Sequence, residues 1–198
     1  MRAGDLRVDV VAEKPPASAD FTETTVATRL AYDGGLLKVR RDEVRLPGGA
    51  TAWREYVVHP GAVVILAFAS DDTILLERQF RYPKHRHFIE LPAGKLERDE
   101  PPLGTARREL AEECGFEARE WWRIAVLDPC IGYSTETIEL YGARGLTHVG
   151  ASLDEGEHLE TFEAKVAHAL EWVRDGIITD TKTTLGLLWW AQWGKFPT

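Results

Sequence analysis

The sequence predicts a layered fold of strands and helices, of the α/β or α+β class. Three observations lead to this prediction. Strand-like segments and turn motifs fill the first half of the chain, one acidic helix-like segment follows, and the C-terminal part has helical periodicity. Strands that flank one helix and are followed by further helices pack in layers around a common core. With 198 residues the chain is long enough for one well-buried domain with an N-terminal appendage.

The N-terminal part divides into a polar lead-in and a β-meander. Residues 1–20 are polar and contain the break Pro15-Pro16, so we expect a flexible segment there. In the segment 21–58, the Gly-rich turns Asp33-Gly34-Gly35 and Pro47-Gly48-Gly49 are typical of hairpins. The strands of this meander are expected at 25–32, 36–46 and 52–58. The main domain is then expected over 59–198.

The main domain is expected to have strands on both sides of the acidic segment. Runs of apolar residues around the turn Asp71-Asp72 predict buried strands. The expected strands are 63–69, 73–79, 88–91, 122–127 and 137–143. Towards the C-terminus, apolar residues at helical spacing predict a helix that Gly176 closes. These residues are Phe162, Val166, Leu170 and Val173. A second helix is expected over 182–193.

The acidic segment is predicted to be a helix with three glutamates on one face. A helix turns by about 100° per residue, so Glu112 lies about 60° to one side of Glu109 and Glu113 about 40° to the other. An apolar stripe on a neighbouring face gives the helix a surface to bury. The stripe consists of Leu103, Ala106, Leu110 and Cys114. Residues suited to the helix ends are Asp99 as a cap, Pro101 and Pro102 in the first turn, and Gly115 just past the end.

Like charges at this spacing repel each other, so a positive partner is expected beside them. Carboxylate oxygens are ligands of hard cations, and Mg²⁺ uses a few carboxylates together with water and substrate phosphates. Arg108 lies next to the acidic row and is suited to hold a glutamate in place. Taken alone, the three glutamates equally fit a solvated helix face with charge pairs.

The wider segment, from Gly94 to Phe116, has a defined spacing. Gly94 is followed after five residues by Glu100, and seven more residues lead to Arg108-Glu109-Leu110-Ala111-Glu112-Glu113-Cys114-Gly115-Phe116. A chance match to this pattern is expected on the order of 10⁻⁹ per start position. The segment resembles the Nudix box, Gly-x5-Glu-x7-Arg-Glu-U-x-Glu-Glu-x-Gly-U with U apolar, at every defined position. The resemblance implies an α/β/α sandwich with a mixed sheet, in which the box forms a loop, a helix and a loop.

The flanking segments Glu90-Leu91-Pro92-Ala93-Gly94 and Gln79-Phe80-Arg81-Tyr82-Pro83 resemble the ADP-ribose pyrophosphatase branch of that family. The resemblance extends from about Asp33 to Trp189 and implies hydrolysis of ADP-ribose to AMP and ribose 5-phosphate. It implies Mg²⁺, with Mn²⁺ as a substitute, held by the carbonyl of Ala93 and by Glu109, Glu112 and Glu113. It also implies a homodimer formed through the meander, and substrate contacts from Arg81, Gln79 and Glu90. Without this context, Arg81 fits a surface ion pair.

Two loops after the box carry further candidates. Pro129-Cys130-Ile131-Gly132-Tyr133-Ser134-Thr135-Glu136 resembles a loop of the branch, except that Ile131 stands where a proline is common. Glu136 fits a substrate, metal or water contact and a plain surface position equally well. The acidic loop Asp154-Glu155-Gly156-Glu157 resembles the one that carries the catalytic glutamate, and alignment does not decide between Glu155 and Glu157. Such a loop is also typical of a solvated connection.

An aromatic side chain is needed to stack on the adenine base, and Trp53 and Tyr32 of the meander are the candidates for this role across a dimer interface. Both also fit a core position.

The composition restricts the classes of binding partner: a net charge of −8 opposes nonspecific binding to nucleic acid or anionic lipid. The cysteines Cys114 and Cys130 form no disulfide framework, and no apolar run is long enough to span a membrane. We therefore expect a cytoplasmic protein without membrane or nucleic-acid partners.

The expected function is Mg²⁺-dependent hydrolysis of the diphosphate of ADP-ribose, with Arg108 and the box glutamates in the catalytic centre. Two alternatives stay open at this point. One is hydrolysis of a different nucleoside diphosphate sugar, which the departure at Ile131 allows. The other is a sensor that binds a nucleotide metabolite without turnover, although such proteins usually carry a damaged box.

Overall fold

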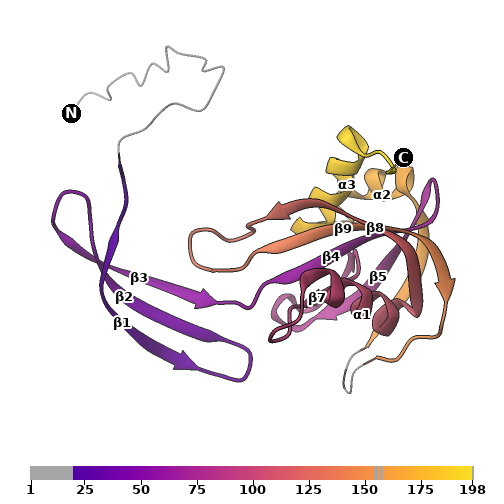
Figure 1. Cartoon of the computed structure of the whole chain (residues 1–198). Helices are drawn as coiled ribbons and strands as arrows, with labels where there is room; N and C mark the ends of the chain where they lie inside the picture. Colours follow the sequence, from indigo (N-terminus) through magenta and orange to yellow (C-terminus); the bar gives the residue numbers. More distant parts are fainter. Residues whose placement is uncertain (1–19, 154–155, 157, 198) are drawn as a thin grey trace, which may run out of the picture.

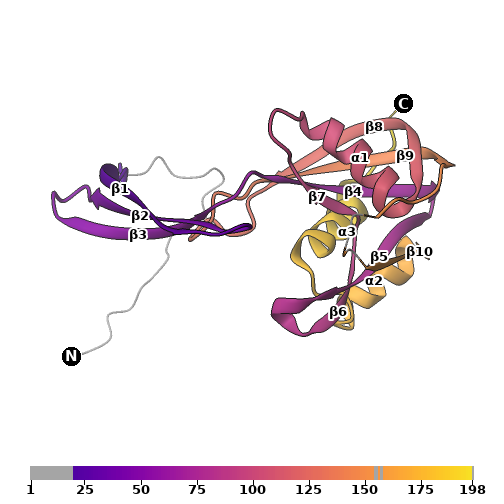
Figure 2. The ribbon, with the colours of Figure 1, turned by 90° about the horizontal axis from the view of Figure 1, so that it is seen from below.

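The computed structural model describes residues 20–153, 156 and 158–197, so most of the predicted lead-in lies outside it. The strands of the described residues form two sheets, one of three strands and one of seven. Figures 1 and 2 show the three-stranded sheet projecting from one end of a larger body that contains the second sheet and the helices. In the described part of the chain, no helix is long and apolar enough to cross a lipid bilayer.

The three-stranded sheet is the predicted meander. It consists of β1 (Thr24–Asp33), β2 (Lys38–Arg45) and β3 (Thr51–Val58), paired in that order and antiparallel. Every residue of β1 is exposed. Among the described residues of the meander only Asp42 and Val44 are buried, and the Asp42 carboxylate accepts a hydrogen bond from the Tyr56 hydroxyl at 2.9 Å. The meander therefore has almost no core of its own.

The second sheet is mixed. Its strands are β4 (Ala62–Ser70), β5 (Thr73–Arg81), β6 (Arg86–Glu90), β7 (Ala93–Lys95), β8 (Phe116–Leu127), β9 (Ile138–His148) and β10 (Leu159–Lys165), with a 3₁₀ turn at Tyr82–Lys84. The main path runs β10-β5-β4-β9-β8. The pair β4–β9 is parallel and the other pairs are antiparallel. This confirms the predicted mixed sheet.

Strands β4 and β5 separate soon after their shared turn. They pair only next to that turn, at Phe68 with Ile74 and Ser70 with Thr73. Farther along, β4 pairs with the short strand β7 and β5 pairs with β6. The sheet thus opens between its two central strands, and the chain from β6 to β7 passes through the opening, where the Ile65 N–H donates to the Pro92 carbonyl at 2.8 Å.

Helices cover both faces of this sheet. Helix α1 (Pro102–Cys114) lies on one face, and α2 (Val166–Arg174) and α3 (Thr181–Trp193) lie on the other (Figure 1). Strand β4 contributes side chains to the core on both faces of the sheet, because successive side chains of a strand point in opposite directions. Its Val63, Ile65 and Ala67 belong to the cluster that contains the buried face of α1, whereas Val64, Leu66 and Phe68 pack with residues of α2 and α3. The α/β/α sandwich is confirmed.

Most of the expected elements are present, with shifted ends, but two expectations were wrong. Phe162 lies in β10 and not in a helix, because Leu159–Lys165 pairs along the free edge of β5 and α2 begins only at Val166. Asp99 does not cap α1: it has a left-handed backbone (φ 64°), and the N-cap residue is Pro101 without a side-chain bond. Strand β7 was not expected. Gly115 ends α1 in the left-handed conformation, as predicted.

Candidate active site

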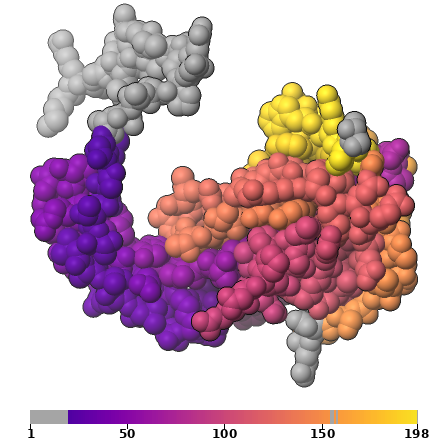
Figure 3. Space-filling model, in the orientation of Figure 1, coloured from indigo at the N-terminus to yellow at the C-terminus, as the bar shows by residue number. Residues whose placement is uncertain are grey.

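A cavity of about 870 Å³ lies at the opening between β4 and β5. Its walls come from the start of β4, the ends of β5 and β6, strand β7, helix α1 and the start of α3. The meander contributes Leu36, and the loop between β8 and β9 contributes Pro129 and Glu136. The volume is within the usual range for small-molecule sites, which is about 300–1,000 Å³. The space-filling view shows the meander as an arm that extends away from the body (Figure 3).

Helix α1 presents the predicted acidic row to this cavity, because Glu109, Glu112 and Glu113 all line it. Glu113 is only 6% exposed and accepts a hydrogen bond from the Ala93 N–H at 3.3 Å. Glu109 lies against Gly94, where an added Cβ would be 1.9 Å from the glutamate carboxyl group. The glycine therefore lets the backbone of β7 approach the acidic row, and Ala93 also lines the cavity.

Arg108 ties the acidic row together. Its guanidinium contacts Glu109 at 3.0 Å, Glu112 at 2.9 Å and Glu100 at 3.1 Å. The Glu100 carboxylate also accepts from the Thr105 hydroxyl at 2.7 Å. The bonds from Arg108 and Thr105 lower the pKa of Glu100, and the bond to Glu100 raises the pKa of Arg108 despite partial burial. Arg108 thus occupies the position beside the glutamates that was expected of it.

The donors beside the cavity suit a hard divalent cation. The acidic row supplies carboxylate oxygens, which Mg²⁺ and Mn²⁺ prefer. Among the residues that the structure describes, no three acidic, histidine or cysteine side chains converge into a complete metal cage. Mg²⁺ does not require one, because it keeps several waters and takes oxygens from substrate phosphates. The residues present therefore fit a metal that is shared with a phosphate ligand.

The charges around the cavity lead to the same conclusion. Its described lining has three cationic side chains and six carboxylates. The cations are Arg81, Lys95 and Lys182, and the carboxylates are Glu90, Glu109, Glu112, Glu113, Glu136 and Asp180. A lining with excess negative charge repels a diphosphate unless bound cations offset that charge.

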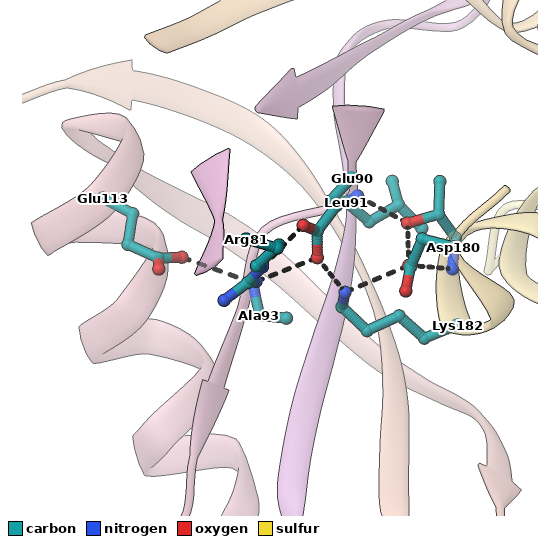
Figure 4. Close-up of polar contacts among 8 residues, drawn as sticks. Arg81, Glu90, Leu91, Ala93, Glu113, Asp180 and Lys182 are labelled. Carbon is teal, nitrogen blue, oxygen red and sulfur yellow. Dashed lines mark hydrogen bonds and ion pairs between the residues drawn. The ribbon is translucent and has the colours of Figure 1, made fainter. Parts of the chain in front are cut away.

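The other predicted substrate contacts of the main domain also reach the cavity. Gln79, Arg81 and Glu90 line it, and Arg81 forms a two-pronged bond with Glu90, at 2.7 Å from Nε and 2.9 Å from Nη2 (Figure 4). Burial acts to raise the pKa of Glu90, but the bonds from Arg81 and from Lys182 outweigh it and lower the pKa. Glu90 is therefore an ionised anchor for both cations.

Glu136 lines the cavity beside a histidine that sequence reasoning missed. The Nε2 atom of His59 lies 3.8 Å from the Glu136 carboxylate, and its Nδ1 accepts from the Gly61 N–H at 3.1 Å. His59 is at the junction of the meander and β4, so the meander and the site are adjacent in the chain. The break His59-Pro60-Gly61 between two strands was the only sequence signal available for this position.

Among the predicted residues, Trp53 is described but is not brought to the cavity, and two others lie outside the described residues. Trp53 lies on the meander, where the Arg41 guanidinium is 4.5 Å from the centre of its ring, and it does not line the cavity of its own chain. Glu155 and Glu157 lie outside the described residues, although Gly156 lines the cavity. Sequence reasoning missed Asp180, Thr181 and Lys182, which reach the cavity from the start of α3.

Both regions of the chain match models of known protein families. The NUDIX domain model matches residues 58–174, and the model of the nucleoside diphosphate sugar hydrolase N-terminal domain matches residues 23–57. A methanol dehydrogenase activator from Bacillus methanolicus is 39% identical over 84% of this chain and 91% of its own length. An ADP-ribose pyrophosphatase from Bacillus subtilis (strain 168) is 35% identical over 83% of this chain and 90% of its own.

A solved structure has the same fold. It is that of an ADP compounds hydrolase, which superposes with a TM-score of 0.79 at 21% identity, over 89% of this chain and 96% of the other. The similarity covers both the meander and the sandwich, because the superposed part exceeds either region alone.

Proposed function

This chain belongs to the NUDIX family and is a Nudix pyrophosphohydrolase, and we propose that it cleaves the diphosphate of ADP-ribose to AMP and ribose 5-phosphate. The observation that carries the proposal is the acidic row of α1 on a nucleotide-sized cavity, with Ala93 and Gly94 packed against it. The choice of ADP-ribose is supported by the Bacillus subtilis relative that is named for this substrate.

The metal site of this proposal uses the Ala93 carbonyl and the carboxylates of Glu109, Glu112 and Glu113. A divalent cation bound there, Mg²⁺ or in its place Mn²⁺, neutralises charge on the diphosphate and lowers the pKa of a bound water. Arg108 keeps Glu109 and Glu112 in position through its ion pairs with them. Gly94 keeps open the space that the Glu109 carboxylate occupies.

The remaining residues bind and orient the substrate and its attacking water. Arg81 carries a planar donor fork, which suits phosphate oxygens, and Glu90 fixes its direction. Gln79 and Glu136 line the same cavity and are suited to the ribose hydroxyls, because each side chain accepts hydrogen bonds. We assign the proton of the attacking water to Glu155 or Glu157 as general base, next to Gly156 at the cavity.

We also propose a homodimer formed through the meander, as a distinct dimerisation element (21–58) attached to the catalytic domain (59–198). Support comes from the large apolar side chains that this element exposes: Val26, Leu30, Tyr32, Leu36, Leu37 and Trp53. A three-stranded sheet with so little core needs another surface to cover it. In the dimer, Trp53 reaches the cavity of the second copy and stacks on the base. The two free cysteines suit a cytoplasmic location.

A second substrate class has support from the N-terminal region. The model that matches residues 23–57 is described by nucleoside diphosphate sugars in general. The same metal site and Arg81 suit any diphosphate, because carboxylates, a divalent cation and a guanidinium bind phosphate oxygens whichever base the substrate carries. Hydrolysis of a different nucleoside diphosphate sugar is therefore the alternative to ADP-ribose.

The test is a substrate panel assayed with Mg²⁺ and with chelator. The panel contains ADP-ribose, other ADP- and GDP-sugars, NADH and a nucleoside triphosphate. We expect AMP release from ADP-ribose that disappears with chelator and falls at least about a hundredfold in Glu109→Gln, since even outer-shell changes at metal sites cost about 10–100-fold. Glu117→Gln, an exposed position on β8, is the matched control and should retain activity.

Each contrary result has a distinct meaning. Turnover of a different diphosphate alone would retain the reaction class and reject ADP-ribose as substrate. Tight binding of a nucleotide without turnover of any compound would reject the enzyme and support a sensor.

A further inference from the structure

Lys182 is a cationic side chain that lines the cavity and has no assigned role in the proposed reaction. It lies in the first turn of α3 and lines the cavity with Asp180 and Thr181. Its side chain is 15% exposed, so most of it is fixed in the wall. Figure 4 shows Glu113 of α1 on one side, Lys182 of α3 on the other, and Arg81 with Glu90 between them.

The architecture fixes the position of Lys182. Asp180 caps α3, and its Oδ2 atom accepts from the Thr183 N–H at 3.0 Å and from the Thr183 hydroxyl at 2.6 Å. The Thr183 oxygen in turn accepts from the Leu91 N–H at 2.8 Å. Since Leu91 directly follows Glu90, these bonds join the start of α3 to the end of β6. Lys182 therefore extends from a rigid junction of two elements.

Two cations converge on one buried carboxylate at this junction. The Glu90 side chain is 5% exposed and is bound by Arg81 through two nitrogens and by Lys182 through Nζ. The Lys182 ammonium also contacts Asp180 Oδ2 at 3.0 Å. A buried carboxylate held by two charged donors sets the spacing between those donors. Glu90 thus places Arg81 and Lys182 side by side on the cavity wall.

Both cations have N–H groups that are not bonded to Glu90 or Asp180. A lysine ammonium has three N–H groups, and Glu90 and Asp180 take two of those on Lys182. A guanidinium has five, and Glu90 takes two of those on Arg81. Within the described part of the chain, one donor on Lys182 and three on Arg81 therefore remain for a ligand. Both side chains line the cavity.

We propose that Lys182 is a further substrate-binding residue, which donates its third N–H to a non-bridging oxygen of the diphosphate beside Arg81. The inference rests on the proposed hydrolase function and assigns one more contact of that site. The acidic row of α1 and the pair Arg81–Lys182 then hold the diphosphate from two sides. A purely structural role, in which Lys182 only neutralises Glu90 and Asp180, is the competing explanation.

Binding measurements separate the two roles without turnover. The ligands are ADP-ribose with a methylene group in place of the bridging diphosphate oxygen, inorganic pyrophosphate, and adenosine as the ligand without phosphate. Each is titrated calorimetrically with Mg²⁺ into the full chain. The variants are Lys182→Met, which keeps the length of the side chain, Lys182→Arg, which keeps the charge, and Lys195→Met as the control at an exposed lysine outside the cavity lining.

We expect Lys182→Met to bind the methylene analogue and pyrophosphate about tenfold to a hundredfold more weakly, the usual effect of one hydrogen bond to a charged group. Adenosine affinity should stay unchanged, Lys182→Arg should recover most of the loss, and Lys195→Met should match the wild type. The inference is overturned if Lys182→Met binds both phosphate ligands as the wild type does. It is also overturned if adenosine binding falls equally, as loss of wall structure would cause.

The result is independent of the substrate assay. If the wild type does not hydrolyse ADP-ribose but Lys182→Met selectively loses pyrophosphate, the proposed function fails and the Lys182 contact stands. If ADP-ribose is hydrolysed and Lys182→Met binds normally, the function stands and the contact fails. A wild type that binds neither phosphate ligand would reject both.

Discussion

The sandwich and the meander differ in how each is stabilised. In the sandwich, both faces of β4 are buried, and its residues from Val63 to Ala67 are fully inaccessible to solvent. In the meander, every residue of β1 is exposed, including Leu30 at 51%. Burial of apolar surface is the main favourable contribution to folding, so the sandwich supplies its own stability. The meander depends on contacts made elsewhere.

One such contact lies within the chain and leads to the site. The Val57 N–H of β3 donates to the Tyr133 carbonyl at 2.9 Å, and the Thr135 N–H donates to the Val57 carbonyl at 3.0 Å. The same loop carries Glu136, which lines the cavity together with Leu36 of the meander. The poorly buried region is thus attached next to the cavity, while the well-buried region holds the acidic row. The sandwich supplies the buried core, whereas residues of both regions line the cavity.

The largest expected effect is on the core of the sandwich. Phe68 is 1% exposed and packs against the rings of Trp122, Trp190 and Phe196. Phe68→Ala should lower the free energy of unfolding by about 3–5 kcal/mol, through lost contacts and the resulting cavity. Urea denaturation measures this. In the meander, Leu30→Ala should change it by no more than about 0.5 kcal/mol. Equal losses in both variants would contradict the division between the regions.

The second-largest expected effect is on the catalytic activity and not on the free energy of unfolding. Gly94→Ala places a methyl group 1.9 Å from the Glu109 carboxyl, so that the glutamate must move away from β7. We expect kcat/KM for the diphosphate substrate to fall about a hundredfold, which is about 2.7 kcal/mol in the barrier. The matched control is Gly132→Ala, where an added Cβ meets no atom within 4 Å. A Gly94→Ala enzyme with normal activity would show that Glu109 is free to move.

A substitution in the meander is expected to have a smaller effect on the free energy of unfolding but to weaken the proposed dimer. Leu30→Glu places a charge on its exposed apolar surface and should shift the proposed dimer towards monomer, as measured by analytical ultracentrifugation. Leu188→Glu is the matched control, because Leu188 of α3 is also half exposed, at 50%. If both variants dissociate equally, or if the wild type is already a monomer, the meander is not the dimerisation element.

The smallest effect is electrostatic and lies at the β4–β5 turn of the sandwich. Bonds from Lys165, Ser70 and Thr73 lower the pKa of Asp72 from 3.8 to about 2. A depressed pKa in the folded state gives stability that is present above the unfolded pKa and lost as the pH falls through the folded one. Asp72→Asn should therefore lose less stability than the wild type between about pH 4 and pH 2.

Thermal unfolding of both proteins across that pH interval measures this difference. Asp71→Asn removes a charge from the same turn without removing the pair with Lys165 and is the control. A wild-type protein whose loss of stability over this interval equals that of Asp72→Asn would show that the Asp72–Lys165 contact does not stabilise the fold.

Local patterns in the sequence predicted the parts of the structure that local interactions determine. Glycine turns marked the meander, and helical spacing put Glu109, Glu112 and Glu113 on one face of α1. The failures concern contacts between distant segments. Phe162 has an apolar neighbour at helical spacing, yet the free edge of β5 pairs with its backbone and makes it a strand. Lys182 meets Glu90 from 92 positions away, so no local pattern could assign it to the site.

No local sequence pattern predicted the opening of the sheet between β4 and β5, for a similar reason. Whether β4 continues to pair with β5 depends on β6 and β7, which compete for the same edges. The same holds for His59, which reaches Glu136 only when the loop after β8 lies along β3. The box was predictable because its residues lie close together in the sequence, whereas the remaining walls of the cavity form only on folding.

The central claim is that the acidic row of α1 holds a divalent metal ion, and Mn²⁺ binding tests it most directly. Electron paramagnetic resonance during a Mn²⁺ titration counts free and bound metal in the wild type, in Glu113→Gln and in the control Glu117→Gln, with circular dichroism to verify the fold. We expect saturable binding in the wild type and control that Mg²⁺ displaces, and an affinity at least about tenfold weaker in Glu113→Gln. Unchanged Mn²⁺ binding in folded Glu113→Gln would contradict the claim.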